Sequence, residues 1–391
     1  MTFHTLSTLN NRTRQQTGVV TAALIVWSLV MLWLCWSYGM ASEYSDYPGY
    51  LGQWQRLLDG LNPWSLEDGN AYGPLHAVIG FLLSWGELVP KFFMVSAMLM
   101  ANAALVFELM RERGVNPIQT IYLLSVPMNL MVVGAGVMDG LNDAFVAALL
   151  TFAILLRFRD YLLAAGMLVG LAALTKYYPL LLLPFFALDE RRLSWSVIAS
   201  GIAIFFIGFV SALAIWGQAP IDAIFLAVNR GPKIFSIIAA LKSLFGDASV
   251  ISWLARYNAY FVVSGVAAVF LFAWWARVNW LEGAVLGYLV MLTAYKVGSG
   301  NYYLPWLFLV AALPLVNRWS ADRMAIILLP AVLLVSLADF GYRFASDRYN
   351  DGLSWVRSYG GFVAFAVSAA SITLCAFTLL RVAAKAELRD K

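Results

Sequence analysis

The stretch VVTAALIVWSLVMLWLCWSYGM, residues 19–40, decides the fold class because it carries no charged side chain. A helix needs about 20 consecutive apolar residues to cross the hydrocarbon core of a bilayer, and this stretch supplies them. Arg12 and Arg14 precede it, and no small-residue cleavage site follows. We therefore expect an uncleaved first helix and not a signal peptide.

The composition of the whole chain agrees with this expectation. Of its 391 residues, 62% are hydrophobic and only 12% are charged, whereas a soluble domain carries about 25% charged residues. This composition excludes a water-soluble enzyme of this length and a disordered or fibrous chain. It predicts a protein that crosses a membrane many times.

Further apolar runs have the composition of buried or membrane-spanning helices, although 178–188 is too short to cross a bilayer straight. Two other segments, 74–87 and 234–253, are short or interrupted by polar residues, and we expect re-entrant or interfacial helices there. The predicted helical runs are 19–40, 92–110, 118–135, 144–157, 161–175, 178–188, 194–216, 257–276, 281–297, 302–317, 323–340 and 359–381.

Basic residues predict the orientation of the chain in the membrane, because they recur in short loops after every second predicted crossing. Loops rich in Lys and Arg remain in the cytoplasm, so both termini are predicted to be cytoplasmic and the number of crossings to be even, about twelve. The loops on the opposite side hold most of the other polar clusters. The basic loop residues include Arg111, Arg113, Arg157, Arg159, Arg192, Arg277 and Arg318.

The predicted architecture is one all-α integral-membrane domain over residues 1–391, a polytopic transmembrane helical bundle. Within it, 41–73 forms the first outer loop, 74–310 the remainder of the core and 311–391 the C-terminal helices. Apolar residues between Tyr47 and Leu61 recur at helical spacing, which predicts an interfacial helix in the first outer loop.

Asp46 follows the first helix in a loop that also contains Tyr44, Tyr47 and Tyr50. A carboxylate at the edge of a site of low dielectric constant can act as a general base. An Asp shortly before Pro48 is also a good helix start, so the residues alone leave open a helix cap or a solvated loop acid.

A second outer cluster spans residues 138–143, with the sequence MDGLND. Asp139, Asn142 and Asp143 can contact sugar hydroxyls, and the two carboxylates can bind a divalent cation through oxygen ligands. Two carboxylates without further ligands at suitable spacing are only weak evidence for a metal site, so Asp139 and Asp143 are weak candidates for one. Asn142 or Asp143 can equally cap the helix that begins near residue 144.

Five cations stand near the predicted outer ends of helices, on the side where basic residues are depleted. Each can snorkel to the interface, but together they fit a phosphate, which arginine contacts well in bidentate geometry. Tyr302 fits either an interfacial aromatic belt or a ligand contact. The five cations are Lys176, Arg230, Lys233, Lys296 and Arg343.

Other chemistries lack a pattern in this sequence. Cys35 and Cys375 lie inside apolar runs, and His4 and His76 lie far apart, so neither a disulfide nor a His/Cys metal spacing is indicated. The basic residues are scattered, so no nucleic-acid partner is expected. The sequence indicates no particular cofactor, although it is compatible with a divalent cation.

Several short motifs follow one another between residues 40 and 310. In this order they resemble the GT-C class of integral-membrane glycosyltransferases, and most of all the polyprenol-phosphate-mannose-dependent mannosyltransferases of glycosyltransferase family eighty-seven and their GPI-mannosyltransferase relatives. Gly73 stands where the family often has proline, and either Asp139 or Asp143 matches its second acidic position. The motifs are Asp46 with Tyr50, Gly60-Leu61-Asn62-Pro63-Trp64, Tyr72-Gly73-Pro74, Asp139 to Asp143, Ala165-Gly166 to Lys176 and Pro179, and Tyr302 to Trp306.

The resemblance implies transfer of a sugar, with mannose favoured, from a polyprenyl-phosphate donor to a lipid or glycan acceptor, usually with inversion. Asp46 would be the general base, and no nucleotide sugar would be used. Independently of the resemblance, the compact loops and the lack of organelle signals indicate a multi-pass protein of a bacterial inner membrane, among membrane lipids. The charge bias of the loops predicts that the active site lies on the periplasmic face. The five cations would bind the donor phosphate, and Asp139, Asn142, Asp143, Tyr44, Tyr50 and Tyr302 would bind the sugar or acceptor.

Other functions stay open. The main alternative is a transporter or flippase for a lipid or solute, although the helix centres are almost free of charge and no repeat is evident. A membrane polymerase or ligase that uses a lipid-linked sugar is another alternative, and a non-catalytic subunit of a glycosylation complex is a third.

Overall fold

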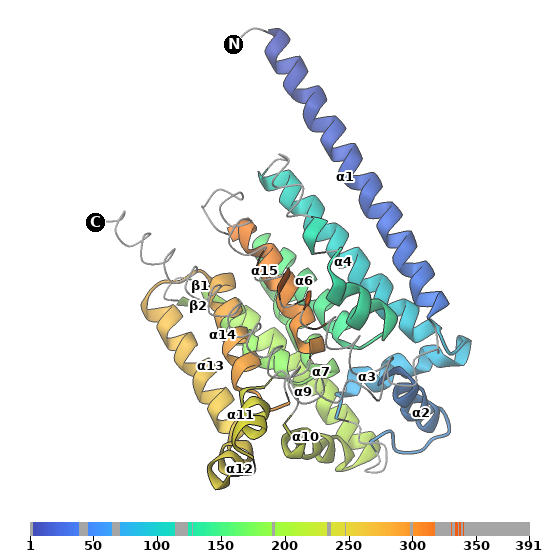
Figure 1. The fold of residues 1–391 in the computed structure, drawn as a ribbon, viewed down its shortest axis with the longest axis vertical. Helices are drawn as coiled ribbons and strands as arrows, with labels where there is room; N and C mark the ends of the chain where they lie inside the picture. Colours follow the sequence, from blue (N-terminus) through green and yellow to red (C-terminus); the bar gives the residue numbers. More distant parts are fainter. Residues whose placement is uncertain are drawn as a thin grey trace.

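The computed structural model describes residues 3–38, 46–64, 71–113, 124–126, 128–189, 192–232, 236–246, 248–297 and 300–316, and isolated positions between 330 and 339. These residues are almost entirely helical (Figure 1). The first half contains α1 (Phe3–Ser37), α2 (Asp46–Leu58), α3 (Pro74–Ile79), η2 (Gly80–Trp85), α4 (Val89–Arg113), the π-helix η3 (Val132–Met138), α6 (Asp143–Phe158), α7 (Leu162–Thr175), η4 (Tyr178–Leu182) and α8 (Leu183–Ala187). The second half contains β1 (Leu188–Asp189), β2 (Arg192–Leu193), α9 (Trp195–Trp216), α10 (Ala219–Asn229), α11 (Ile237–Phe245), α12 (Ser249–Arg256), α13 (Asn258–Trp275), α14 (Trp280–Ala294), η5 (Gly300–Tyr302) and α15 (Tyr303–Val316).

The helical runs predicted at 92–110, 161–175, 194–216, 257–276, 281–297 and 302–317 are confirmed as α4, α7, α9, α13, α14 and α15. The segments 74–87 and 234–253, predicted to be short or broken, are α3 with η2 and α11 with α12. Apolar composition bounded by polar or glycine residues sets these limits: α9 begins after Ser194 and ends before Gly217, whose φ is 62°. The runs 323–340 and 359–381 lie largely or wholly outside the described residues.

Four described helices are long and apolar enough to cross a membrane, namely α1 over Thr17–Ser37, α4, α9 and α13. A fifth candidate is the pair η3 and α6, which meet at an angle of 110°. Other apolar helices, such as α7 and α15, have 14 residues each, and at about 1.5 Å per residue they are shorter than a bilayer core of about 30 Å. The predicted count of about twelve crossings is therefore not confirmed.

The bundle has a buried centre and an apolar outside. Most residues of α6, α14 and α15 are buried, whereas α1, α9 and α13 expose large hydrophobic side chains such as Trp33, Phe206 and Trp275. An outward apolar surface of this extent suits lipid and not water. The arrangement supports a membrane protein.

Helices α7 and α9 pack closely through small residues. A side chain at Gly166 would overlap the backbone of Val197, and a Cβ at Gly170 would lie 2.5 Å from the carbonyl oxygen of Gly201. Small residues four apart allow such close approach between helices in a membrane, where van der Waals packing replaces the hydrophobic driving force. This contact positions the end of α7, which carries Lys176.

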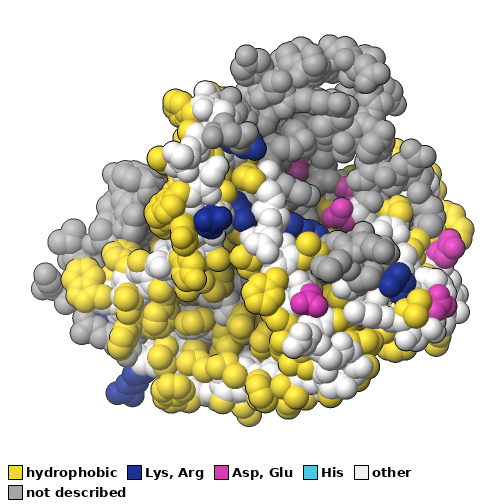
Figure 2. Space-filling model, turned by 90° about the horizontal axis from the view of Figure 1, so that it is seen from below, with side chains coloured by type: hydrophobic (Ala, Val, Ile, Leu, Met, Phe, Trp, Pro, Cys, Tyr) yellow, Lys and Arg dark blue, Asp and Glu magenta, His cyan; other side chains and the backbone are white. Residues whose placement is uncertain are grey.

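The short helices α2, α3, α10, α11 and α12 gather at one end of the bundle (Figure 1). Seen from that end, charged side chains are few and lie among a largely hydrophobic surface (Figure 2). The apolar face of α2 packs on the protein: the indole Nε1 of Trp54 donates to the carbonyl of His76 at 2.8 Å, and the Tyr47 hydroxyl donates to that of Glu87 at 2.6 Å. This helix confirms the predicted amphipathic pattern, but its buried face covers α3 and η2.

At the opposite end, a two-residue antiparallel ladder joins β1 to β2 (Figure 1). Sequence reasoning missed this hairpin when it predicted an all-α fold. The buried Arg157 secures it, because its guanidinium donates to the carbonyls of Phe186 at 3.0 Å and Leu188 at 3.4 Å and lies over the Trp280 ring. Those bonds give two backbone carbonyls next to the hairpin a hydrogen-bond partner.

Candidate functional site

A buried polar network lies at the start of α6, where the bend from η3 places Asp143 in the first helical turn. The Asp143 carboxylate is fully buried. Its Oδ2 accepts from Lys176 Nζ at 2.6 Å and from Asn301 Nδ2 at 2.5 Å, and its Oδ1 accepts from the Tyr178 hydroxyl at 3.1 Å. The helix dipole also favours a negative charge at this position. The carboxylate therefore joins the start of α6 to the end of α7, to η4 and to η5.

Asn142 extends this network toward α2 and α3. It occupies the N-cap position of α6, but its side chain makes no capping bond. Its Oδ1 accepts from the Tyr50 hydroxyl at 3.3 Å, and its Nδ2 lies 3.5 Å from His76 Nδ1. The Asn142 side chain therefore does not cap α6, which was the alternative role considered from the sequence.

Aromatic rings enclose the ammonium group of Lys176. Its Nζ lies 5.3 Å from the centre of the Tyr72 ring and 4.8 Å from that of Tyr302, distances at which a cation is attracted to a ring face. The Tyr302 ring also packs edge-on against Tyr178. Lys176 is buried, so its charge is held by Asp143 and these rings.

Asp46 begins α2 and is exposed. Its Oδ2 accepts a long hydrogen bond, 3.5 Å, from the hydroxyl of Tyr72. Tyr72 packs edge-on against Tyr50, with ring centres 5.1 Å apart, and burial raises the pKa of the Tyr72 phenol well above its usual value. A protonated phenol thus links the exposed carboxylate to the buried network, with Lys176 over its ring.

The other predicted cations fall in different places. Arg230 follows α10, is half-buried, and interacts electrostatically with the phenols of Tyr72 and Tyr302. Lys296 is buried, and its Nζ donates to the carbonyl of Ala255 in α12 at 3.0 Å. Their predicted contacts with phosphate stay predictions. Tyr44, Lys233 and Arg343 lie outside the described residues.

Asp139 is half-buried and interacts electrostatically with Lys91. The Lys91 ammonium donates to the carbonyl of Met138 at 2.6 Å and lies over the Tyr47 ring. Among the described residues, no group of three or more His, Cys, Asp and Glu side chains could hold a metal ion. A divalent cation at Asp139 or Asp143 stays a prediction, and at Asp143 it would have to displace Lys176.

Among the residues that the structure describes, two buried polar atoms of this network have no hydrogen-bond partner, His76 Nε2 and Asn301 Oδ1. Burial lowers the pKa of His76 to about 3, and the charge of Lys176 acts in the same direction, so the ring is neutral at pH 7. If Nδ1 accepts from the Asn142 amide, Nε2 carries the proton. The site then offers one neutral donor and one neutral acceptor, and each of them suits a ligand hydroxyl or a water.

Sequence reasoning did not select His76, Tyr72, Tyr178 or Asn301 for this site. Their surroundings were visible, since Tyr72 precedes Gly73-Pro74 and Asn301 directly precedes the Tyr302 to Trp306 motif. The sequence did not indicate that Asn301 is bonded to Asp143, because the two residues are 158 positions apart. Helix packing alone brings them together.

The sequence model of Glycosyltransferase family 87 matches residues 70–296, which is more than half of the chain. The chain belongs to this family. Because glycosyltransferase family 87 is part of the GT-C class, the predicted resemblance is confirmed and the protein is a glycosyltransferase by family. A comparison with curated proteins found no match.

The part that matches glycosyltransferase family 87 contains Tyr72, Asp143, Lys176 and Arg230. Asp46 precedes the matched part, and Asn301 follows it. Both are nevertheless in hydrogen-bond contact with residues inside it, Asp46 with Tyr72 and Asn301 with Asp143. The site is therefore built from the matched core and from both flanking segments.

Proposed function

We propose that the protein transfers a sugar, with mannose favoured, from a polyprenyl-phosphate donor to a lipid or glycan acceptor, with Asp46 as general base. The observation that carries the proposal is the place of Tyr72. Its hydroxyl donates to Asp46, and its ring lies against Lys176 Nζ at 5.3 Å. An accessible base and a cation thus lie on either side of one side chain, a separation that suits an acceptor hydroxyl and a leaving phosphate.

The proposed reaction is a single displacement. The acceptor oxygen attacks the anomeric carbon while its proton passes to the Asp46 carboxylate. The bond between that carbon and the phosphate oxygen breaks, and polyprenyl phosphate leaves with the bonding electrons. Attack from the face opposite the leaving group inverts the anomeric configuration.

Positive charge near the departing phosphate lowers the barrier, because negative charge grows on it in the transition state. Lys176 shares its charge with Asp143, so the half-buried Arg230 is the main candidate for direct phosphate contact. Its guanidinium can form two parallel hydrogen bonds to phosphate oxygens. Lys233, Lys296 and Arg343 are further candidates.

The sugar would lie next to the unpaired atoms of His76 and Asn301. Sugar hydroxyls both donate and accept, so a hydroxyl can donate to Asn301 Oδ1 and a hydroxyl can accept from His76 Nε2. Asp139, Asn142, Tyr50 and Tyr302 complete the proposed sugar or acceptor site. We place it on the periplasmic face of a bacterial inner membrane, because the basic ends of α4, α6 and α13 would face the cytoplasm.

The test is sugar transfer by membranes that contain the wild type or a variant. Asp46→Asn should lower kcat by about 10²–10⁴-fold, the usual contribution of a general base. The matched control is Asp59→Asn, because Asp59 is an exposed acid just after α2 that is bonded to Gln55. Near-wild-type turnover by Asp46→Asn would remove Asp46 as the base.

The donor is tested separately with purified protein. Polyprenyl-phosphate mannose should support transfer, and nucleotide-linked mannose should not. A panel of polyprenyl-phosphate glucose, galactose and arabinose identifies the sugar. Transfer from a nucleotide sugar without lipid donor would contradict the proposal, whereas unassisted movement of the lipid donor across vesicles would favour a flippase.

A further inference from the structure

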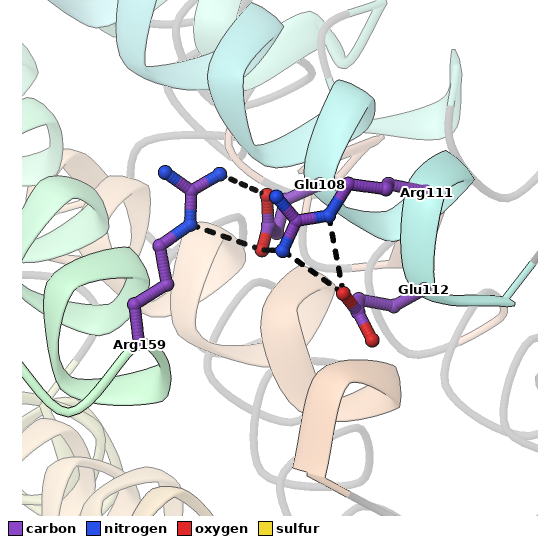
Figure 3. Close-up of polar contacts among 4 residues, drawn as sticks. All are labelled: Glu108, Arg111, Glu112 and Arg159. Atoms are coloured by element: carbon purple, nitrogen blue, oxygen red, sulfur yellow. Dashed lines mark hydrogen bonds and ion pairs between the residues drawn. The ribbon is translucent and has the colours of Figure 1, made fainter.

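A second polar cluster lies at the other end of the bundle, where α4 and α6 finish (Figure 3). Arg159 Nη2 and Nε donate to the two oxygens of Glu108 at 2.5 and 3.2 Å. Arg111 Nη2 donates to Glu108 at 2.6 Å and to Glu112 at 2.9 Å. Glu108 is only 3% exposed, so its charge is fixed between the two guanidinium groups.

A cavity of about 390 Å³ opens beside this cluster, within the range of about 300–1,000 Å³ found for small-ligand sites. Its wall is apolar except for the charged residues at its mouth. The apolar part belongs to facing sides of α4 and α6 and includes the half-exposed Phe107. The lining residues are Ala104, Phe107, Glu108, Arg111, Phe152, Leu155, Leu156 and Arg159.

Unused hydrogen-bonding groups remain on the lining residues Arg111 and Arg159 and on Glu112, which is bonded to Arg111 just outside the cavity. Within the described part of the chain, Arg159 Nη1 and Arg111 Nη1 have no acceptor, and Glu112 accepts only at Oε1. Figure 3 shows Arg159 Nη1 directed away from Glu108. The cluster therefore offers two guanidinium edges and one carboxylate oxygen to a ligand that carries charges of both signs.

The position in the membrane matches the same ligand. The candidate span in α4 ends at Glu112, so the charged groups stand where a lipid headgroup would be. Ala104 and Phe107 lie about one to two helical turns further into the membrane than Glu112, at about 1.5 Å per residue. The charged groups at the mouth would therefore lie at the level of a phospholipid headgroup, and the apolar wall would lie at the level of its acyl chain.

We propose that this cavity binds a zwitterionic aminophospholipid. The phosphate would contact the free guanidinium nitrogens of Arg159 and Arg111, the primary ammonium would donate to Glu112, and the upper part of an acyl chain would fill the space beside Phe107. The two positive charges of the arginines equal the two negative charges of the glutamates, so the cluster has no net charge. It therefore favours a lipid without net charge over an anionic one. A choline headgroup carries no N–H and cannot donate to Glu112.

The proposal does not depend on the sugar-transfer reaction and is tested by lipid binding. Purified protein in detergent is incubated with equal amounts of phosphatidylethanolamine, phosphatidylglycerol and phosphatidylcholine, and retained lipid is measured by native mass spectrometry. We expect phosphatidylethanolamine to be retained at least about fivefold over each of the others, since hydrogen bonds to charged groups are among the stronger ones. Glu112→Gln should reduce that ratio to about one.

Two further variants complete the test. Leu156→Trp fills the cavity without changing its charge and should lower retention of all three lipids. Arg277→Gln removes an exposed arginine after α13 and should leave retention unchanged. Equal retention of the three lipids by the wild type would overturn the proposal, and so would a lipid preference that Glu112→Gln leaves intact.

Discussion

The buried ion pair between Asp143 and Lys176 should stabilise the bundle only as a pair. Both side chains are buried, and Asp143 Oδ2 lies 2.6 Å from Lys176 Nζ. Asp143→Asn removes the negative charge and leaves an ammonium group without a counter-ion, flanked by the rings of Tyr72 and Tyr302. Breaking a buried pair from one side costs about 3–5 kcal/mol of unfolding free energy.

The double variant Asp143→Asn with Lys176→Met separates this cost from lost packing. It removes both charges together, and replacing a whole buried pair is often close to neutral. We therefore expect the double variant to be more stable than Asp143→Asn alone. Asp160→Asn is the matched control, because that pair with Arg157 is 3.4 Å long and Asp160 is 87% exposed. Exposed pairs contribute about 0–1 kcal/mol.

The assay is unfolding in mixed micelles of increasing SDS content, followed by the fluorescence of the 15 tryptophans. A loss below about 1 kcal/mol for Asp143→Asn, as for a surface pair, would refute the reasoning. The same conclusion would follow if the destabilisations of the two single variants simply added in the double variant, because contacting charges should couple.

Three other results are expected. His76 is neutral in the folded protein, with a pKa of about 3 against 6.5 when exposed, so its contribution to stability is complete above pH 6.5 and falls as pH drops toward 3. From pH 7.5 to 4.5 the wild type should lose about 2–3 kcal/mol more than His76→Asn, and equal losses would argue that the ring is accessible. Gly170→Val should destabilise by several kcal/mol because its side chain would meet Gly201, and an unchanged unfolding curve would contradict that packing. In a variant without native cysteines, Cys at position 59 should react with an impermeant reagent in intact cells and Cys at position 160 only after lysis, and the reverse would invert the orientation.

Local composition was sufficient to predict most described helices. The run 194–216 became α9 because Ser194 and Gly217 bound an uninterrupted apolar segment. Polar interruptions likewise predicted the separation of α11 from α12. The hairpin of β1 and β2 was missed because two residues per strand are too few for a periodic signal. The 110° bend before α6 depends on tertiary packing around Gly140, whose φ is 61°.

The site was predictable in its residue types but not in its contacts. Asp143, Lys176 and Tyr302 were chosen from separate clusters, and the structure brings them together. The sequence did not indicate that Lys176 is bonded to Asp143, since hydropathy reports burial and not partners. Asn301 was missed for the same reason. The neutral state of His76 depends on its complete burial, which no local pattern discloses.

The central claim is that a donor phosphate and the base Asp46 lie on opposite sides of Tyr72. The most direct measurement is an electron cryomicroscopy structure of the protein with a non-transferable polyprenyl-phosphate sugar analogue. We predict phosphate density in contact with Arg230, near Lys176, and the anomeric carbon turned toward the Asp46 carboxylate. Phosphate density at another end of the bundle, with the sugar remote from Asp46, would contradict the account.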